Sequence, residues 1–157
     1  MKIQLLALLG LLGLTGCSSS KTTVASFYTY ETECLGVELD GSQTLRVWGS
    51  GKNKKDAVEQ AKKNAVHDVL FKGVRQGKSE CNMKPLMIEV NAEEKYADYF
   101  QRFLRDGGEY RKYTSSEDEK TSSKISQTNQ VSTKYGVTVR VLRSELKERL
   151  KSDGIIK

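Results

Sequence analysis

The sequence is poor in the residues that mark catalytic and metal-binding sites. Its 157 residues include one histidine, His67, and three cysteines, none of them in a Cys-x-x-Cys pair. The Gly-x-Ser-x-Gly and His-Glu-x-x-His motifs, which place a nucleophile or a zinc ion, are absent. No spaced pair of carboxylates typical of a glycosidase is visible either. We therefore expect that the protein is not an enzyme and has no catalytic residues, metal or cofactor.

Proline is scarce as well, with Pro85 as the single example, and glycines are scattered. This composition argues against a long flexible stalk, and the length suits one folded domain. The net charge is +6, yet acidic residues lie among the lysines of the most basic segment. Those lysines are Lys52, Lys54, Lys55, Lys62 and Lys63. Such mixing is typical of a solvated helix face, so we expect no nucleic-acid partner.

The chain begins with a hydrophobic leader that ends in Leu14-Thr15-Gly16-Cys17. Lys2 provides a charged start, and the apolar run is shorter than the roughly 20 residues of a transmembrane helix. This is the layout of a bacterial lipoprotein signal, in which small residues precede a cysteine that receives a diacylglyceryl group. We predict acyl chains such as palmitate at Cys17. The alternative is an ordinary secretory signal with an unrelated cysteine.

The residue after the lipobox bears on location. Ser18 stands there, not the aspartate that is associated with inner-membrane retention in many Gram-negative bacteria. The sequence therefore favours an outer-membrane lipoprotein that is lipid-anchored and faces the periplasm. We divide the chain into a signal peptide (1–16), a Ser- and Thr-rich lipidated tether (17–26) and a single domain (27–157).

Export changes the interpretation of the other two cysteines. Cys34 and Cys81 form an even pair in an oxidising compartment, so a disulfide between them fits the sequence. Two buried free thiols fit it equally well, because a sequence contains no geometry.

The first half of the domain has clear local signals. The sequence favours β-structure from Phe27, with a bulge or bend before residue 35, and Asp40-Gly41 predicts a hairpin turn. The next strand alternates, with Leu45 and Val47 on the face opposite Arg46 and Trp48. Asn53 then caps a helix with an apolar stripe. The stripe consists of Ala57, Val58, Ala61, Ala65 and Val69.

The second half predicts a buried strand over 86–90 and a helix that begins with a capping box at Asn91 and Glu94. Its aromatic side chains share one face, which indicates core, although a ligand box has the same pattern. They are Tyr96, Tyr99, Phe100 and Phe103. A strand over 109–114, a half-buried strand up to Arg143 and a short helix capped by Ser144 complete the pattern. We predict an α+β fold: an antiparallel-rich sheet with two main helices packed on one face and a short C-terminal helix.

Three features resemble binding sites. Gly49, Gly51 and Lys52 lie between a strand and a helix, where an anion can bind, but the spacing of a P-loop is missing and a tight turn explains both glycines. His67 falls on the polar helix face beside Gln60 and Lys63, which indicates a surface residue. The acidic run 117–119 indicates a solvated loop, since calcium loops need a different spacing.

The run from Leu45 to Gly51, followed by Ala57, Ala61 and Ala65, resembles a known group of proteins. These are small envelope lipoproteins and the N-terminal domains of flagellar outer-ring assembly proteins. The resemblance covers the lipobox and about residues 43–73, and it leaves the segment from Pro85 to Gly108 uncovered. It implies an α+β domain, attachment to the outer membrane and a structural or assembly role.

We therefore expect a lipid-anchored accessory component of an outer-membrane assembly, which acts through contacts with an envelope protein. One alternative is a periplasmic small-ligand or cell-wall-binding module that uses the basic turn from Lys52 to Lys55. Another is a hydrolase with an unrecognised site. An exposed apolar patch would favour the first, and a deep pocket with convergent polar groups the others. The sequence does not indicate an oligomeric state.

Overall fold

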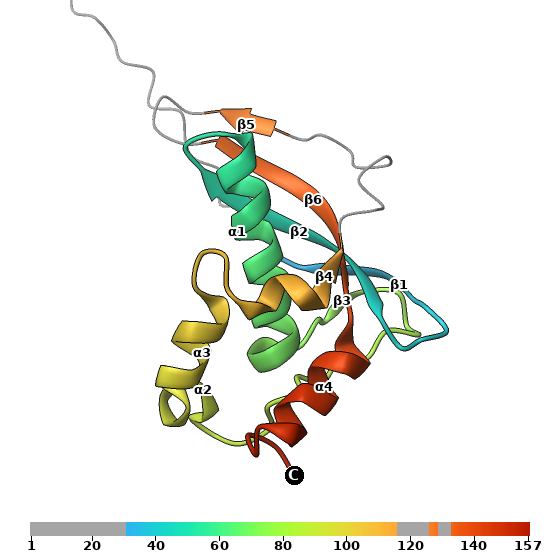
Figure 1. Cartoon of the computed structure of the whole chain (residues 1–157). Coiled ribbons are helices and arrows are strands. Elements are labelled where there is room, and N and C mark those ends of the chain that lie inside the picture. Colours follow the sequence, from blue (N-terminus) through green and yellow to red (C-terminus); the bar gives the residue numbers. More distant parts are fainter. Residues whose placement is uncertain (1–30, 116–125, 129–132) are drawn as a thin grey trace, which may run out of the picture.

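A computed structural model describes residues 31–115, 126–128 and 133–157, which form an α+β fold (Figure 1). The predicted signal peptide, Cys17, the tether and the acidic run 117–119 lie outside these ranges. Among the described residues, no helix is long and apolar enough to cross a membrane.

The sheet has six strands in the order β3-β1-β2-β6-β4, and β5 pairs with β6 beside this path. The strands are β1 (Glu33–Val37), β2 (Gln43–Gly51), β3 (Gln76–Gly77), β4 (Thr114–Ser115), β5 (Ser126–Thr128) and β6 (Thr133–Val141). β3 runs parallel to β1, while β2 is antiparallel to both β1 and β6. The sheet is therefore mixed, which corrects the antiparallel-rich expectation. A two-residue strand leaves no periodicity in a sequence, so β3 had no signal.

The hairpin between β1 and β2 confirms the turn prediction. The amide of Gly41 donates to the carbonyl of Glu38 at 2.9 Å, and the carboxylate of Asp40 accepts from the amide of Ser42 at 2.8 Å. Gly41 has a φ of 79°, a left-handed conformation that glycine adopts without strain. The pairing register shifts between Cys34 and Gly36, which is the irregularity that the sequence indicated.

Helix α1 (Lys54–His67) packs on β2 and β6, the two longest strands. Its N-cap is Asn53, whose side chain accepts from the amide of Asp56 at 3.0 Å, as expected. The alanines of the predicted stripe are buried against the sheet, which confirms that prediction. The helix continues as a π-helix, η1 (Asp68–Lys72), and ends at Gly73, where φ is 74°.

The segment 86–90, predicted as a buried strand, is irregular. The amides of Leu86 and Met87 donate to the carbonyls of Val69 and Leu70 at 3.0 and 2.8 Å. These carbonyls lie in the last turn of a helix, which leaves them without intrahelical donors. The segment therefore completes η1 instead of joining the sheet, and Ile88 is left 83% exposed.

The second predicted helix forms as two pieces, α2 (Ala92–Lys95) and α3 (Ala97–Leu104). The capping-box prediction is wrong, because Asn91 is left-handed (φ 59°) and its side chain caps nothing. The aromatic face is core, as expected: Phe100 and Phe103 are buried, and the ring of Phe100 meets that of Phe71 edge-on at 4.7 Å.

Two predictions near the C-terminus are also corrected. Most of the strand expected over 109–114 is a 3-10 helix, η2 (Glu109–Tyr113). Tyr110 and Tyr113 are both buried, and in a 3-10 helix residues three apart lie on the same side, so both can face the core. The last helix is α4 (Arg143–Ser152), and its N-cap position is Leu142, so Ser144 does not cap it. The strand before it, β6, ends at Val141.

Candidate functional site

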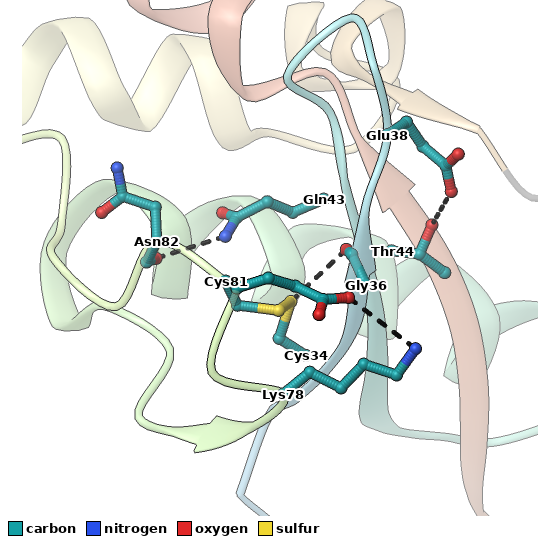
Figure 2. The surroundings of a disulfide bond; sticks show 9 residues. Cys34, Gly36, Glu38, Gln43, Thr44, Lys78, Cys81 and Asn82 are labelled. Atoms are coloured by element: carbon teal, nitrogen blue, oxygen red, sulfur yellow. Dashed lines mark hydrogen bonds and ion pairs between the residues drawn. A yellow bond between two sulfur atoms is a disulfide. The ribbon is translucent and has the colours of Figure 1, made fainter.

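The predicted cysteine pair forms a disulfide. Cys34 in β1 is bonded to Cys81, 47 residues later, with their Cα atoms 6.3 Å apart, which excludes the alternative of two free thiols. Figure 2 shows a second link beside it, in which the side-chain amide of Gln43 donates to the carbonyl of Asn82 at 3.2 Å. The disulfide and this hydrogen bond fix the start of the irregular segment 82–90 to the hairpin.

An open groove of about 660 Å³ lies between the segment 82–90, helix α4 and the C-terminal residues. Its apolar lining includes Leu86, Met87, Ile88, Tyr96, Ile155 and Ile156. Gly154, with a φ of 72°, reverses the chain after α4, and the amides of Ile155 and Ile156 donate back to the carbonyl of Leu150. This C-terminal motif is what turns the two isoleucines toward the groove.

Arg143, the first residue of α4, is the buried charge of this groove. The residue is only 9% exposed, and its Nη2 donates to the carbonyl of Lys84 at 2.7 Å. Its Nη1 is buried without an acceptor, and no carboxylate of the described residues pairs with it. Burial lowers the pKa of the Arg143 guanidinium, which nevertheless stays charged. An uncompensated buried cation gives the groove a positive potential.

Lysines extend this positive charge around the groove. Lys84, Lys95, Lys147 and Lys157 line it, against one acidic side chain, Glu89. Glu89 is already paired with Lys95, whose ammonium lies 2.6 Å from the carboxylate oxygen. The groove therefore combines an apolar lining with a surplus of cations.

Large apolar side chains are exposed at the edge of the groove, where Ile88 lines it, and beyond it. Ile88 and Val90 are each 83% exposed, and Met83 is 45% exposed. The sequence analysis assigned Ile88 and Val90 to a buried strand. Their apolar character was therefore recognised, but it was interpreted as core and not as exposed surface. Adjacent apolar side chains with this exposure are typical of surfaces that other molecules cover.

The predicted anion-binding turn has a structural explanation. Gly49 and Gly51 belong to β2, and Lys52 is exposed in the turn that follows. A Cβ atom on Gly49 would lie 1.9 Å from the carbonyl oxygen of Ala57, because the backbone of α1 packs directly on this strand. Close packing therefore requires the glycine, and anion binding at Gly49, Gly51 and Lys52 stays a prediction.

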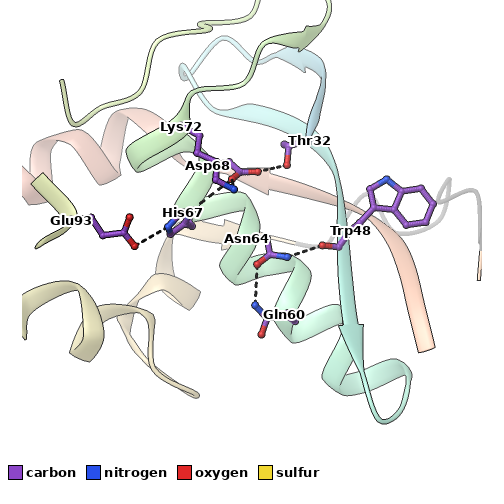
Figure 3. A network of polar contacts seen from close by, with 8 residues as sticks. All are labelled: Thr32, Trp48, Gln60, Asn64, His67, Asp68, Lys72 and Glu93. Carbon is purple, nitrogen blue, oxygen red and sulfur yellow. Dashed lines mark hydrogen bonds and ion pairs between the residues drawn. The ribbon is translucent and has the colours of Figure 1, made fainter. Parts of the chain in front are cut away.

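His67 lies where α1 continues into η1 (Figure 3). Its side chain is 28% exposed. Its Nε2 is 3.1 Å from a carboxylate oxygen of Glu93, and its Nδ1 is 3.8 Å from one of Asp68. Asp68 in turn accepts from the hydroxyl of Thr32. His67 thus connects the end of α1 to α2 and is more buried than the surface residue that the sequence indicated.

The pH dependence of stability follows from this network. The neighbouring carboxylate of Asp68, opposed by burial and aided by Glu93, raises the pKa of His67 above 6.5. The protonated imidazole therefore stabilises the fold below that pH, and this contribution disappears as the pH rises through the raised pKa. We expect the melting temperature to fall between about pH 6 and pH 8. Thermal unfolding of the wild type and His67→Gln tests this, and an equal fall in both would contradict it.

Comparison with known proteins identifies no relative: no family model, no curated protein and no solved structure matches this chain. The resemblance to small envelope lipoproteins and flagellar outer-ring domains therefore stays a prediction. Within the described part of the chain, no three His, Cys, Asp or Glu side chains are grouped as metal ligands.

Proposed function

We propose that the protein is an outer-membrane lipoprotein, anchored through Cys17, that serves as an accessory component of an envelope assembly. It binds a partner protein through the groove at Arg143 and the exposed side chains beside it. The observation that carries this proposal is the exposed apolar pair Ile88 and Val90 next to an apolar, cationic groove. We also propose that the two main helices, α1 and α3, pack on one face of the sheet.

The distribution of apolar surface favours a polypeptide over a small molecule. Val90 and Met83 are exposed outside the lining of the groove, where a ligand inside it would not cover them. A polypeptide segment would fill the groove and cover both side chains. The cations around the groove favour a segment that carries carboxylates among its apolar residues.

A small-ligand or cell-wall-binding module is the second candidate. The groove volume of about 660 Å³ lies within the usual range of small-molecule sites. A ligand with an apolar body and a carboxylate would match its lining and its charge. We assign no catalytic role to the described residues, so the hydrolase alternative gains no support from the groove.

Affinity capture of the full chain from gently solubilised envelopes tests the proposal. Ile88→Asp places a charge beside the groove, and we expect it to reduce capture of a defined set of membrane proteins by more than about tenfold. Leu39→Asp is the matched control, because Leu39 is fully exposed on the hairpin, outside the groove. It should leave capture unchanged.

Two further results decide between the candidates. Cys17→Ala should release the chain from the membrane fraction and weaken capture, because it removes the proposed anchor. A chain that is captured alone, or with the same proteins in the Ile88→Asp and Leu39→Asp variants, would refute the assembly proposal. Ligand screening on the full chain would then test the second candidate.

A further inference from the structure

A second hollow, which shares no lining residue with the groove, lies between α3, η2 and α4. Its volume is about 500 Å³, and four cationic side chains line it, against one carboxylate, Glu109. The cations are Arg102, Arg105, Lys112 and Arg149. They come from α3, the turn that follows it, η2 and α4, so the tertiary structure gathers them, not a run of basic residues in the sequence.

Only part of this positive charge is neutralised. Arg149 pairs with Asp153 at 2.7 Å and with Glu109 at 3.4 Å, and Lys112 shares the same Glu109 oxygen at 3.7 Å. Arg102 and Arg105 pair with no carboxylate among the described residues. Two guanidinium groups in one concave surface therefore remain available to an anion, and the concave shape strengthens their field.

The lining of the hollow includes a stacked pair of aromatic rings and an exposed glycine. The rings of Tyr99 and Phe103 stack at 5.8 Å with an angle of 15° between them, and both residues line the hollow. At Gly107, where φ is 72°, no atom beyond the two neighbouring residues lies within 4 Å of the position that a Cβ would take. A ligand in the hollow would therefore contact the stacked rings of Tyr99 and Phe103, and the space beside Gly107 is open to it.

We propose that this hollow binds a phosphate group. A phosphate has three terminal oxygens and up to two negative charges, enough to engage two guanidinium forks and the Lys112 ammonium together. A carboxylate offers two oxygens and one charge, which one arginine satisfies. A phosphomonoester with these three oxygens has two sources in an envelope, the headgroup of a lipid such as phosphatidic acid or a soluble phosphate ester, and both present the same chemistry to the hollow.

Nuclear magnetic resonance titration of the full chain in detergent with inorganic phosphate tests the site. We expect the amide signals of Gly107 and Gly108 to shift, and Arg102→Gln with Arg105→Gln to weaken binding at least about tenfold. Arg75→Gln with Lys78→Gln is the matched control, because it removes the same charge from exposed positions beside β3, outside both the hollow and the groove. It should leave the titration unchanged.

The sources are separated by reconstituting the full chain in phosphatidylcholine vesicles with and without phosphatidic acid, whose headgroup is a phosphomonoester. Slower hydrogen exchange at Gly107 and Gly108 in the anionic vesicles only would identify a lipid headgroup. Phosphate binding without that protection would identify a soluble ester. The proposal fails if phosphate causes no shift, if the Arg102 and Arg105 variant binds as the wild type does, or if the Arg75 and Lys78 variant weakens binding equally. These results are independent of the groove, since no residue is shared.

Discussion

Removal of the Cys34–Cys81 disulfide should lower the free energy of unfolding by about 4 kcal/mol, because the bond closes a long loop in the unfolded chain. The two cysteines are 47 residues apart, and both are buried. The bond also fixes the segment 82–90, which lines the groove, to β1. Urea unfolding of Cys34→Ala with Cys81→Ala, compared with the wild type, measures the loss.

Reduction of the wild-type disulfide is the control for this experiment. A reducing agent should destabilise the wild type by a similar amount and leave the double variant unchanged. We also expect faster hydrogen exchange in the segment 82–90 after reduction, because its fixed end is released. A wild type whose unfolding does not respond to the reducing agent would contradict the assignment of this bond.

Gly49→Ala should lower the free energy of unfolding by about 3 kcal/mol or more, at the upper end of overpacking effects. The added Cβ would lie 1.9 Å from the carbonyl oxygen of Ala57 and 2.5 Å from the amide nitrogen of Ala61. Both are backbone atoms of α1, so no side-chain rotation relieves the clash, and the helix must move off the sheet. Chemical denaturation followed by circular dichroism measures the effect.

Gly36→Ala is the matched control in the neighbouring strand. The nearest atom to its added Cβ is a carboxylate oxygen of Glu80 at 3.8 Å, an ordinary contact. We therefore expect a change within about 1 kcal/mol. Equal destabilisation by the two substitutions would show that loss of glycine in the sheet, and not the approach of α1, is responsible.

The parts of the fold that the sequence predicted correctly have local causes. The Asp40-Gly41 turn depends on a left-handed glycine, and the Asn53 cap depends on a hydrogen bond three residues along the chain. The alternation of Leu45 and Val47 and the alanine stripe of α1 repeat the periods of a strand and a helix. Each of these signals is complete within one short segment.

The incorrect predictions concern segments whose conformation depends on distant partners. Residues 86–90 have the apolar composition of a strand, but the carbonyls at the end of η1 take their amides. Residues 109–113 become a 3-10 helix because two tyrosines must reach the same core. Neither the carbonyls at the end of η1 nor the core that buries the two tyrosines can be recognised from the sequence of the segment itself.

The candidate site shows the same division. The two apolar side chains beside the groove, Ile88 and Val90, are plain in the sequence, but their exposure is not. Arg143 follows a long strand. No feature of the sequence distinguished it from the other lysines and arginines, which are 26 in all with Arg143 included. Its burial beside Lys84, 59 residues away, arises only when α4 packs against the segment 82–90.

The sequence by itself determined the α+β class, the hairpin, the two long strands, the capped alanine-rich helix and the expectation of a lipid anchor at Cys17. These features follow from side-chain periodicity, turn chemistry and a processing motif, which act between near neighbours. The tertiary structure alone decided the Cys34–Cys81 bond, the parallel strand β3, the groove and the basic hollow. Each of these joins residues far apart in the chain, and such contacts depend on how the elements pack together to bury the core.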